Sequence, residues 1–151
     1  MTDTQVQAWT RLQCEVAVEQ PNIHRDQLIN SFADLDTVLF NDTLAGRVKV
    51  IWKDMIILED RMIGAQCHPA AISRHGVTKC KIWLNHMILN MDDGADVWGT
   101  LIHEMLHAYL DLHTGLFGMF RSHHGDAFRQ SCAKIAERLN LPGVGWENMS
   151  A

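Results

Sequence analysis

The sequence predicts one domain of the α+β class, with helices at both ends of the chain and a short β section between them. Apolar residues recur every three to four positions before residue 40 and again after residue 92, whereas residues 47–85 contain short alternating or β-prone segments. The chain has 151 residues, 47% of them apolar and 21% charged, which is enough for one core without disulfide bonds.

Two helices are predicted before the β section. The first covers residues 4–19, with an N-cap among residues 2–4 and a break at Pro21. Its apolar positions follow helical spacing: Val6, Trp9, Leu12 and Val16. The second covers residues 28–39 and ends at Asn41. Its apolar positions are Leu28, Phe32, Leu35 and Leu39.

The β section is predicted to contain one strand and one hairpin. Residues 47–53 alternate between two faces, one of them rich in lysine, which is typical of a strand. Residues 61–68 and 78–85 are short and β-prone, and Pro69 and Gly76 lie in the segment that joins them. We therefore expect a small antiparallel sheet or hairpin with a long, partly basic turn.

Two further helices are predicted after the β section. One opens at Asp92 and runs through Leu110, and its broad apolar face indicates a mostly buried helix. The last helix runs from about His124 to Asn140 and is ended by Pro142.

The charge distribution argues against a protein that tracks nucleic acid by bulk attraction, which needs a basic face. The net charge is −5, and residues 1–60 hold five basic and ten acidic side chains, whereas residues 61–151 hold eight of each. A local basic patch is still compatible with these numbers. The candidates for binding single-stranded DNA are Arg74, Lys79, Lys81, Arg121, Arg129, Lys134 and Arg138, with Trp83 and Phe120 as residues on which bases could stack.

The amino terminus lacks the pattern of a secretory signal, and no apolar run reaches the roughly 18 to 20 residues that span a bilayer. We therefore expect the chain to act inside a cell, in the nucleus or cytoplasm, without membrane contact. Its four cysteines are then expected to be thiols: Cys14, Cys67, Cys80 and Cys132. Cys67 and Cys80 lie on the two predicted hairpin strands, where we expect them to face each other as core thiols.

Histidine is concentrated in the second half of the chain, where eight of the nine fall after residue 67. Two of them belong to an HExxH sequence, His103-Glu104-Met105-Leu106-His107, inside the predicted buried helix. Composition alone produces such a sequence in this chain with a probability of about 2%. Residues i and i+4 lie on one helix face, so His103 and His107 can reach one zinc ion. Glu104 then lies beside the metal, where a general base for a bound water should be.

Two histidines and a water leave one zinc position for a third protein ligand. His113 stands ten residues after His103, as in HExxHxxGxxH, but Leu110 occupies the position where that pattern needs glycine. Asp126 is a second alternative, although a first-turn aspartate also answers the helix dipole. We favour His124, which follows a loop long enough to return to the active face.

Six segments occur in the order found in the SprT-like family: LFNDTL (39–44), VKVIW (48–52), GAQC (64–67), KCKIWLN (79–85), TLIHEMLHAYL (100–110) and HGDAF (124–128). The chain therefore resembles this family over roughly residues 28–139. The resemblance implies a zincin-like zinc metalloprotease domain, here residues 21–141, preceded by an N-terminal helical extension (1–20) and followed by a tail (142–151). It also implies that His103, His107 and His124 bind Zn²⁺ and that Glu104 is catalytic.

The function expected from the motif and the resemblance is peptide-bond hydrolysis by a Glu-activated, zinc-bound water. The resemblance further implies protein substrates bound or crosslinked to DNA. Two alternatives belong to other classes of protein. One is a non-catalytic scaffold in which zinc serves folding, and the other is a nucleic-acid-binding module with a vestigial site.

Overall fold

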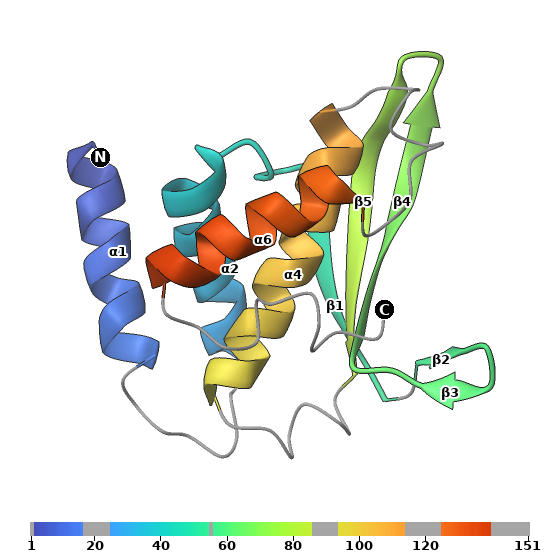
Figure 1. The fold of residues 1–151 in the computed structure, drawn as a ribbon, viewed down its shortest axis with the longest axis horizontal. Coiled ribbons are helices and arrows are strands. Elements are labelled where there is room, and N and C mark those ends of the chain that lie inside the picture. Colours follow the sequence, from blue (N-terminus) through green and yellow to red (C-terminus); the bar gives the residue numbers. More distant parts are fainter. Residues whose placement is uncertain (1, 17–24, 55, 86–93, 114–124, 140–151) are drawn as a thin grey trace.

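The computed structural model describes residues 2–16, 25–54, 56–85, 94–113 and 125–139, which form an α+β fold (Figure 1). The described helices are α1 (Asp3–Val16), α2 (Arg25–Phe40), α4 (Gly94–His113) and α6 (Asp126–Leu139). The described strands are β1 (Val48–Lys53), β2 (Ile57–Leu58), β3 (Arg61–Met62), β4 (Ala65–Ser73) and β5 (Gly76–Asn85). The predicted class is therefore confirmed.

Each predicted helix has a counterpart among the described residues. α2 begins three positions before the first residue of the predicted range, at Arg25, and ends at Phe40. It stops there because Asn41 and Asp42 adopt positive φ angles of 53° and 60°, which leave the helical region. The predicted ends of the first and last helices, at residues 17–19, 124 and 140, lie outside the described residues.

The sheet differs from the predicted antiparallel one because it is mixed. β5 is its central strand, with β4 on one side and β1 on the other. β4 pairs antiparallel with β5, so that Cys67 lies opposite Ile82, which confirms the predicted hairpin. β1 pairs parallel with β5, with Val50 opposite Ile82. A parallel pair needs a long connection, and here the chain between β1 and β5 includes β2, β3 and β4.

The predicted long turn is wrong, and the predicted strand at 61–68 is confirmed only for its second half. Arg61–Met62 pairs with Ile57–Leu58 in a separate two-stranded ribbon, and β4 starts only at Ala65. β4 continues through Pro69 to Ser73, which leaves Arg74 and His75 as the turn. Proline is tolerated because β4 is at the edge of the described sheet, and the register with β5 shifts just after Pro69.

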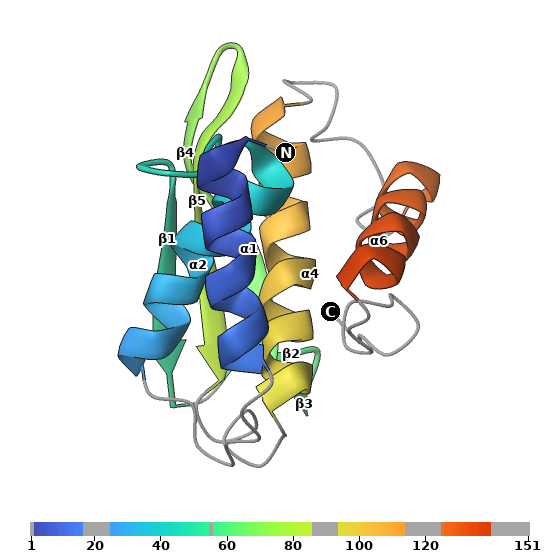
Figure 2. The same cartoon turned by 90° about the vertical axis from the view of Figure 1, so that its left-hand side faces the viewer.

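α4 is the central helix of the described fold. It packs against β4, β5, α2 and α6, and Figure 2 shows α6 on the far side of α4 from the sheet. The sheet turns alternate side chains toward α4, including the buried Cys67, Cys80 and Ile82. This packing confirms the predicted burial of the helix that carries the HExxH sequence. No described helix is long and apolar enough to cross a membrane.

Candidate metal centre

His103, Glu104 and His107 lie in the buried middle of α4. Their exposed fractions are 0%, 2% and 6%, so the sheet and α6 close off this part of the helix. The one-turn spacing brings the two imidazole rings together, with their Nε2 atoms 3.2 Å apart. The two rings therefore present their outer nitrogens to one point.

The separation of the two nitrogens fits a zinc ion. Two nitrogen ligands of a tetrahedral zinc, each at about 2.0 to 2.1 Å, lie about 3.3 to 3.4 Å apart. The observed 3.2 Å between the Nε2 atoms of His103 and His107 is close to this edge length. These two side chains can therefore hold a zinc ion with little rearrangement.

Glu104 is a buried carboxyl with a strongly shifted pKa. Burial raises the pKa of Glu104 to about 8, and the backbone N–H of Cys67 on β4, which donates to the carboxylate, lowers this pKa in part. Oε1 of Glu104 is buried and has no hydrogen-bond partner among the described residues. An unsatisfied buried oxygen is costly, so its presence beside two histidines indicates a site for a polar ligand or a cation.

Phe128 on α6 holds both imidazole rings in place. Its ring stacks on His107 with centroids 4.1 Å apart and lies in a T-shaped arrangement with His103, with centroids 4.8 Å apart. The sequence places Phe128 in the HGDAF segment of the last predicted helix but does not show that it touches both histidines. The HGDAF segment was the available signal, because it joins this phenylalanine to the predicted ligand His124.

His124 lies outside the described residues, so its role as third ligand stays a prediction. The two alternative ligands, His113 and Asp126, lie among the described residues. His113 is exposed at the end of α4, where its Nδ1–H donates to the Tyr109 carbonyl at 2.7 Å and its ring stacks on the Tyr109 ring. Asp126 is exposed in the first turn of α6, where its negative charge interacts favourably with the helix dipole. Neither observation favours these residues as ligands.

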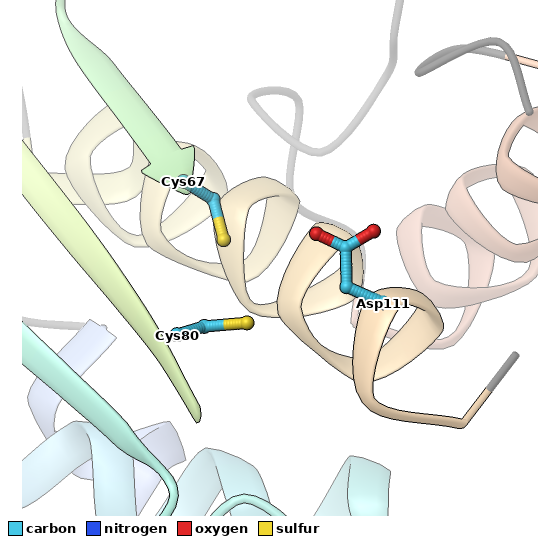
Figure 3. Close-up of side chains that lie close together, drawn as sticks. All are labelled: Cys67, Cys80 and Asp111. Carbon is cyan, nitrogen blue, oxygen red and sulfur yellow. The ribbon is translucent and has the colours of Figure 1, made fainter. Parts of the chain in front are cut away.

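Cys67, Cys80 and Asp111 form a possible metal-binding cluster, referred to below as the thiol cluster. Their ligand atoms all lie within 4.8 Å of one another, and Figure 3 shows the side chains converging from β4, β5 and α4. Both cysteines are free and buried, as predicted. The prediction missed Asp111 here, because only the packing of α4 on the hairpin brings it to the thiols.

The predicted basic residues fall on two separate sides of the domain. Arg74, Lys79 and Lys81 are exposed on the β4–β5 hairpin, whereas Arg129 and Lys134 are exposed on α6, beyond α4. Arg121 and Phe120 lie outside the described residues, as does the Arg138 side chain. The described residues that were candidates for DNA binding therefore do not lie together in one basic patch.

Additional cations lie on the sheet face opposite α4. The alternating pattern of residues 47–53 predicted a lysine-rich face but not the strand beside which it lies. Lys49 pairs in register with Lys81, and Lys53 places Nζ 4.7 Å from the centre of the Trp83 ring. The His68 and Trp83 rings form a T-shaped contact with their centroids 4.0 Å apart. Burial lowers the pKa of His68, and the neighbouring charges of Lys81 and Lys53 lower this pKa further. These side chains define the outer sheet face.

The fold and these side chains define an α+β protein with a candidate metal centre on its central helix. The model of the SprT-like family matches residues 28–145, which is most of the chain, and the chain belongs to this family. The family is generally associated with metalloprotease-type domains. A comparison with curated proteins gave no match.

Proposed function

We propose that this protein is a zinc-dependent metallopeptidase of the SprT-like type. The observation that carries the proposal is the pair of imidazole nitrogens 3.2 Å apart, with the buried carboxyl of Glu104 on the next residue. Membership of the SprT-like family supports it. His103 and His107 would hold the metal together with His124, in the manner of zincin-like proteases.

When bound, zinc would act as a Lewis acid that polarises the peptide carbonyl and lowers the pKa of a water molecule. Glu104 takes the proton from the attacking water as a general base and returns it to the leaving amine. Burial raises the pKa of Glu104 to about 8, and the positive charge of a bound cation would lower this pKa again, so that the carboxylate would be available as a base near neutral pH. The Cys67 N–H and the packing of β4 orient the carboxylate. Phe128 excludes water from one side of the two imidazole rings.

The test compares wild type with Glu104→Gln, which keeps the shape of the side chain but cannot act as a base. We expect zinc content to stay the same and cleavage of an unfolded protein to fall by about a hundredfold or more. Glu59→Gln is the matched control, because Glu59 is an exposed carboxyl in the β2–β3 turn, and it should cleave like wild type. Equal cleavage by wild type and Glu104→Gln would contradict the mechanism and favour a scaffold role for the metal.

We further propose that the substrates are proteins bound or crosslinked to DNA, so that the enzyme serves DNA–protein crosslink repair. The support is the outer sheet face, where Lys49, Lys53 and Lys81 lie on adjacent strands beside Trp83. Three cations at neighbouring positions form a local patch for phosphate groups despite the net charge of −5. This patch is the proposed contact for single-stranded DNA, and Lys53 above Trp83 leaves less of that ring for base stacking.

DNA binding is tested with Lys49→Gln and Lys81→Gln, using Lys134→Gln on α6 as the control cation. Each outer-face substitution should weaken binding of single-stranded DNA and lower the slope of log affinity against log salt by about 0.7. The α6 variant should leave this slope unchanged. Cleavage should also be compared between a protein substrate that is crosslinked to DNA and the same protein without DNA. Equal cleavage of the two substrates, and equal cleavage by wild type and the lysine variants, would remove the crosslink proposal and leave the peptidase proposal standing.

A further inference from the structure

The thiol cluster lies between the β4–β5 hairpin and α4, and its Asp111 is one helical turn beyond His107 on the chain. Cys67 comes from edge strand β4, Cys80 from central strand β5, and Asp111 from α4. The two cysteines are diagonal neighbours, because Cys67 pairs with Ile82 and Cys80 pairs with Pro69. Figure 3 shows both sulfur atoms and the carboxylate directed toward the space between the three elements.

The chemistry of the three groups differs from that of an ordinary apolar core. The Cys67 thiol hydrogen-bonds the Cys80 sulfur, which raises the pKa of Cys67 and lowers the pKa of Cys80. The charge of Asp111 opposes ionisation of both thiols. All three anionic forms therefore repel one another in a buried place, and a cation among them would turn this repulsion into attraction.

The distances allow one ion to reach all three groups. Thiolate sulfurs on one tetrahedral zinc, each at about 2.3 Å, lie about 3.8 Å apart. The sulfur and carboxylate atoms here lie within 4.8 Å of one another, so small side-chain rotations close the difference. Two thiolates and one carboxylate suit a borderline-soft ion better than magnesium or calcium, which take oxygen ligands.

We propose that Cys67, Cys80 and Asp111 form a second cation site, for a thiophilic divalent ion such as zinc, separate from the site at His103 and His107. Three protein ligands leave one position of a tetrahedron for water, and the half-buried Asp111 marks the side from which water would enter. Binding releases the two thiol protons to solvent, because each cysteine coordinates as the thiolate. The proposal does not depend on peptidase activity.

The first experiment measures zinc stoichiometry in reduced protein after removal of loosely bound metal. Wild type should hold one equivalent more than Cys80→Ser. The double variant His103→Ala/His107→Ala should also lose one equivalent relative to wild type, but from the other site. Cys132→Ser is the matched control, because Cys132 is a buried thiol on α6, away from the cluster, and it should match wild type.

The second experiment identifies the ligands by spectroscopy with Co²⁺ in place of zinc. Thiolate-to-cobalt charge transfer gives near-ultraviolet absorption, which a site made only of histidines does not give. Wild type, Cys132→Ser and the double histidine variant should show this absorption. Cys67→Ser and Cys80→Ser should lose most of it, and Asp111→Asn should bind Co²⁺ about tenfold or more weakly.

Two results would overturn the proposal. One is wild-type protein that shows no thiolate absorption with Co²⁺ or Cd²⁺, which would make Cys67 and Cys80 core thiols only. The other is absorption that survives Cys80→Ser but disappears in Cys14→Ser or Cys132→Ser, which would assign it to another thiol. The first result is read on wild type, so the test holds even where a cluster variant does not fold.

Discussion

Replacing Phe128 tests whether α6 stabilises the two histidines as the structure indicates. The side chain is 2% exposed, so nearly its whole apolar surface is removed from water. Burial of about 200 Å² at about 25 cal/mol per Å² corresponds to about 5 kcal/mol, and buried Phe→Ala changes cost about 3 to 5 kcal/mol. We therefore expect Phe128→Ala to lower the free energy of unfolding by about 4 kcal/mol. Phe128→Leu keeps most of the volume and loses the ring contacts, at a cost of about 1 kcal/mol.

The assay combines urea unfolding with zinc affinity, measured by competition with a chromophoric chelator. Phe128→Ala should weaken zinc binding about tenfold, because the ring that stacks on His107 at 4.1 Å no longer fixes its orientation. Phe40→Ala is the matched control. Phe40 is 4% exposed and contacts Tyr109, so it should lose similar stability and keep its zinc affinity.

Two outcomes would refute this reasoning. A loss below about 1 kcal/mol in Phe128→Ala would mean that the ring is not buried as described. Equal zinc affinities for Phe128→Ala and Phe40→Ala, with equal losses of stability, would mean that Phe128 serves the core and does not orient the histidines.

Three further predictions concern other parts of the fold. Burial raises the pKa of Asp36, so the folded chain binds this proton more tightly and the contribution of Asp36 to stability decreases as pH rises past its ordinary pKa. Urea unfolding should therefore show Asp36→Asn to be more favourable relative to wild type at about pH 7 than at about pH 4. Burial raises the pKa of Cys132 to about 12, and mass spectrometry should find this thiol unalkylated at about pH 8 until the protein unfolds. Arg11 donates to both carboxylate oxygens of Asp34 across α1 and α2, so Arg11→Met should cost about 1 kcal/mol in urea unfolding, and no measurable loss would show that the pair does not stabilise the fold.

The helices were predictable because their signal is local. Helical spacing in α2 and α4 depends only on the order of residues along the chain, and both helices were found near their predicted places. The HExxH pair was predictable for the same reason, since four positions make one helical turn. The convergence of His103 and His107 needs no information from any other element.

The sheet was predictable only in part because its pairing is not local. Nothing in residues 48–53 shows that β1 pairs parallel with β5, since many partners fit one alternating strand. Pro69 was read as a mark of the turn, yet an edge strand tolerates proline where the register shifts. The same limit applies to the thiol cluster, where the hairpin predicts that Cys67 meets Cys80 but only the docking of α4 adds Asp111.

Cys67 connects the two proposed metal sites through one residue of β4. Its N–H donates to the carboxylate of Glu104, and its thiol hydrogen-bonds Cys80. A cation that draws the Cys67 sulfur toward Asp111 therefore acts on the same backbone that orients the proposed base. Linkage requires that whatever factor one ion exerts on the binding of the other holds in both directions. The two sites would therefore influence each other through β4 as well as through α4, which carries His103 and His107 of one site and Asp111 of the other.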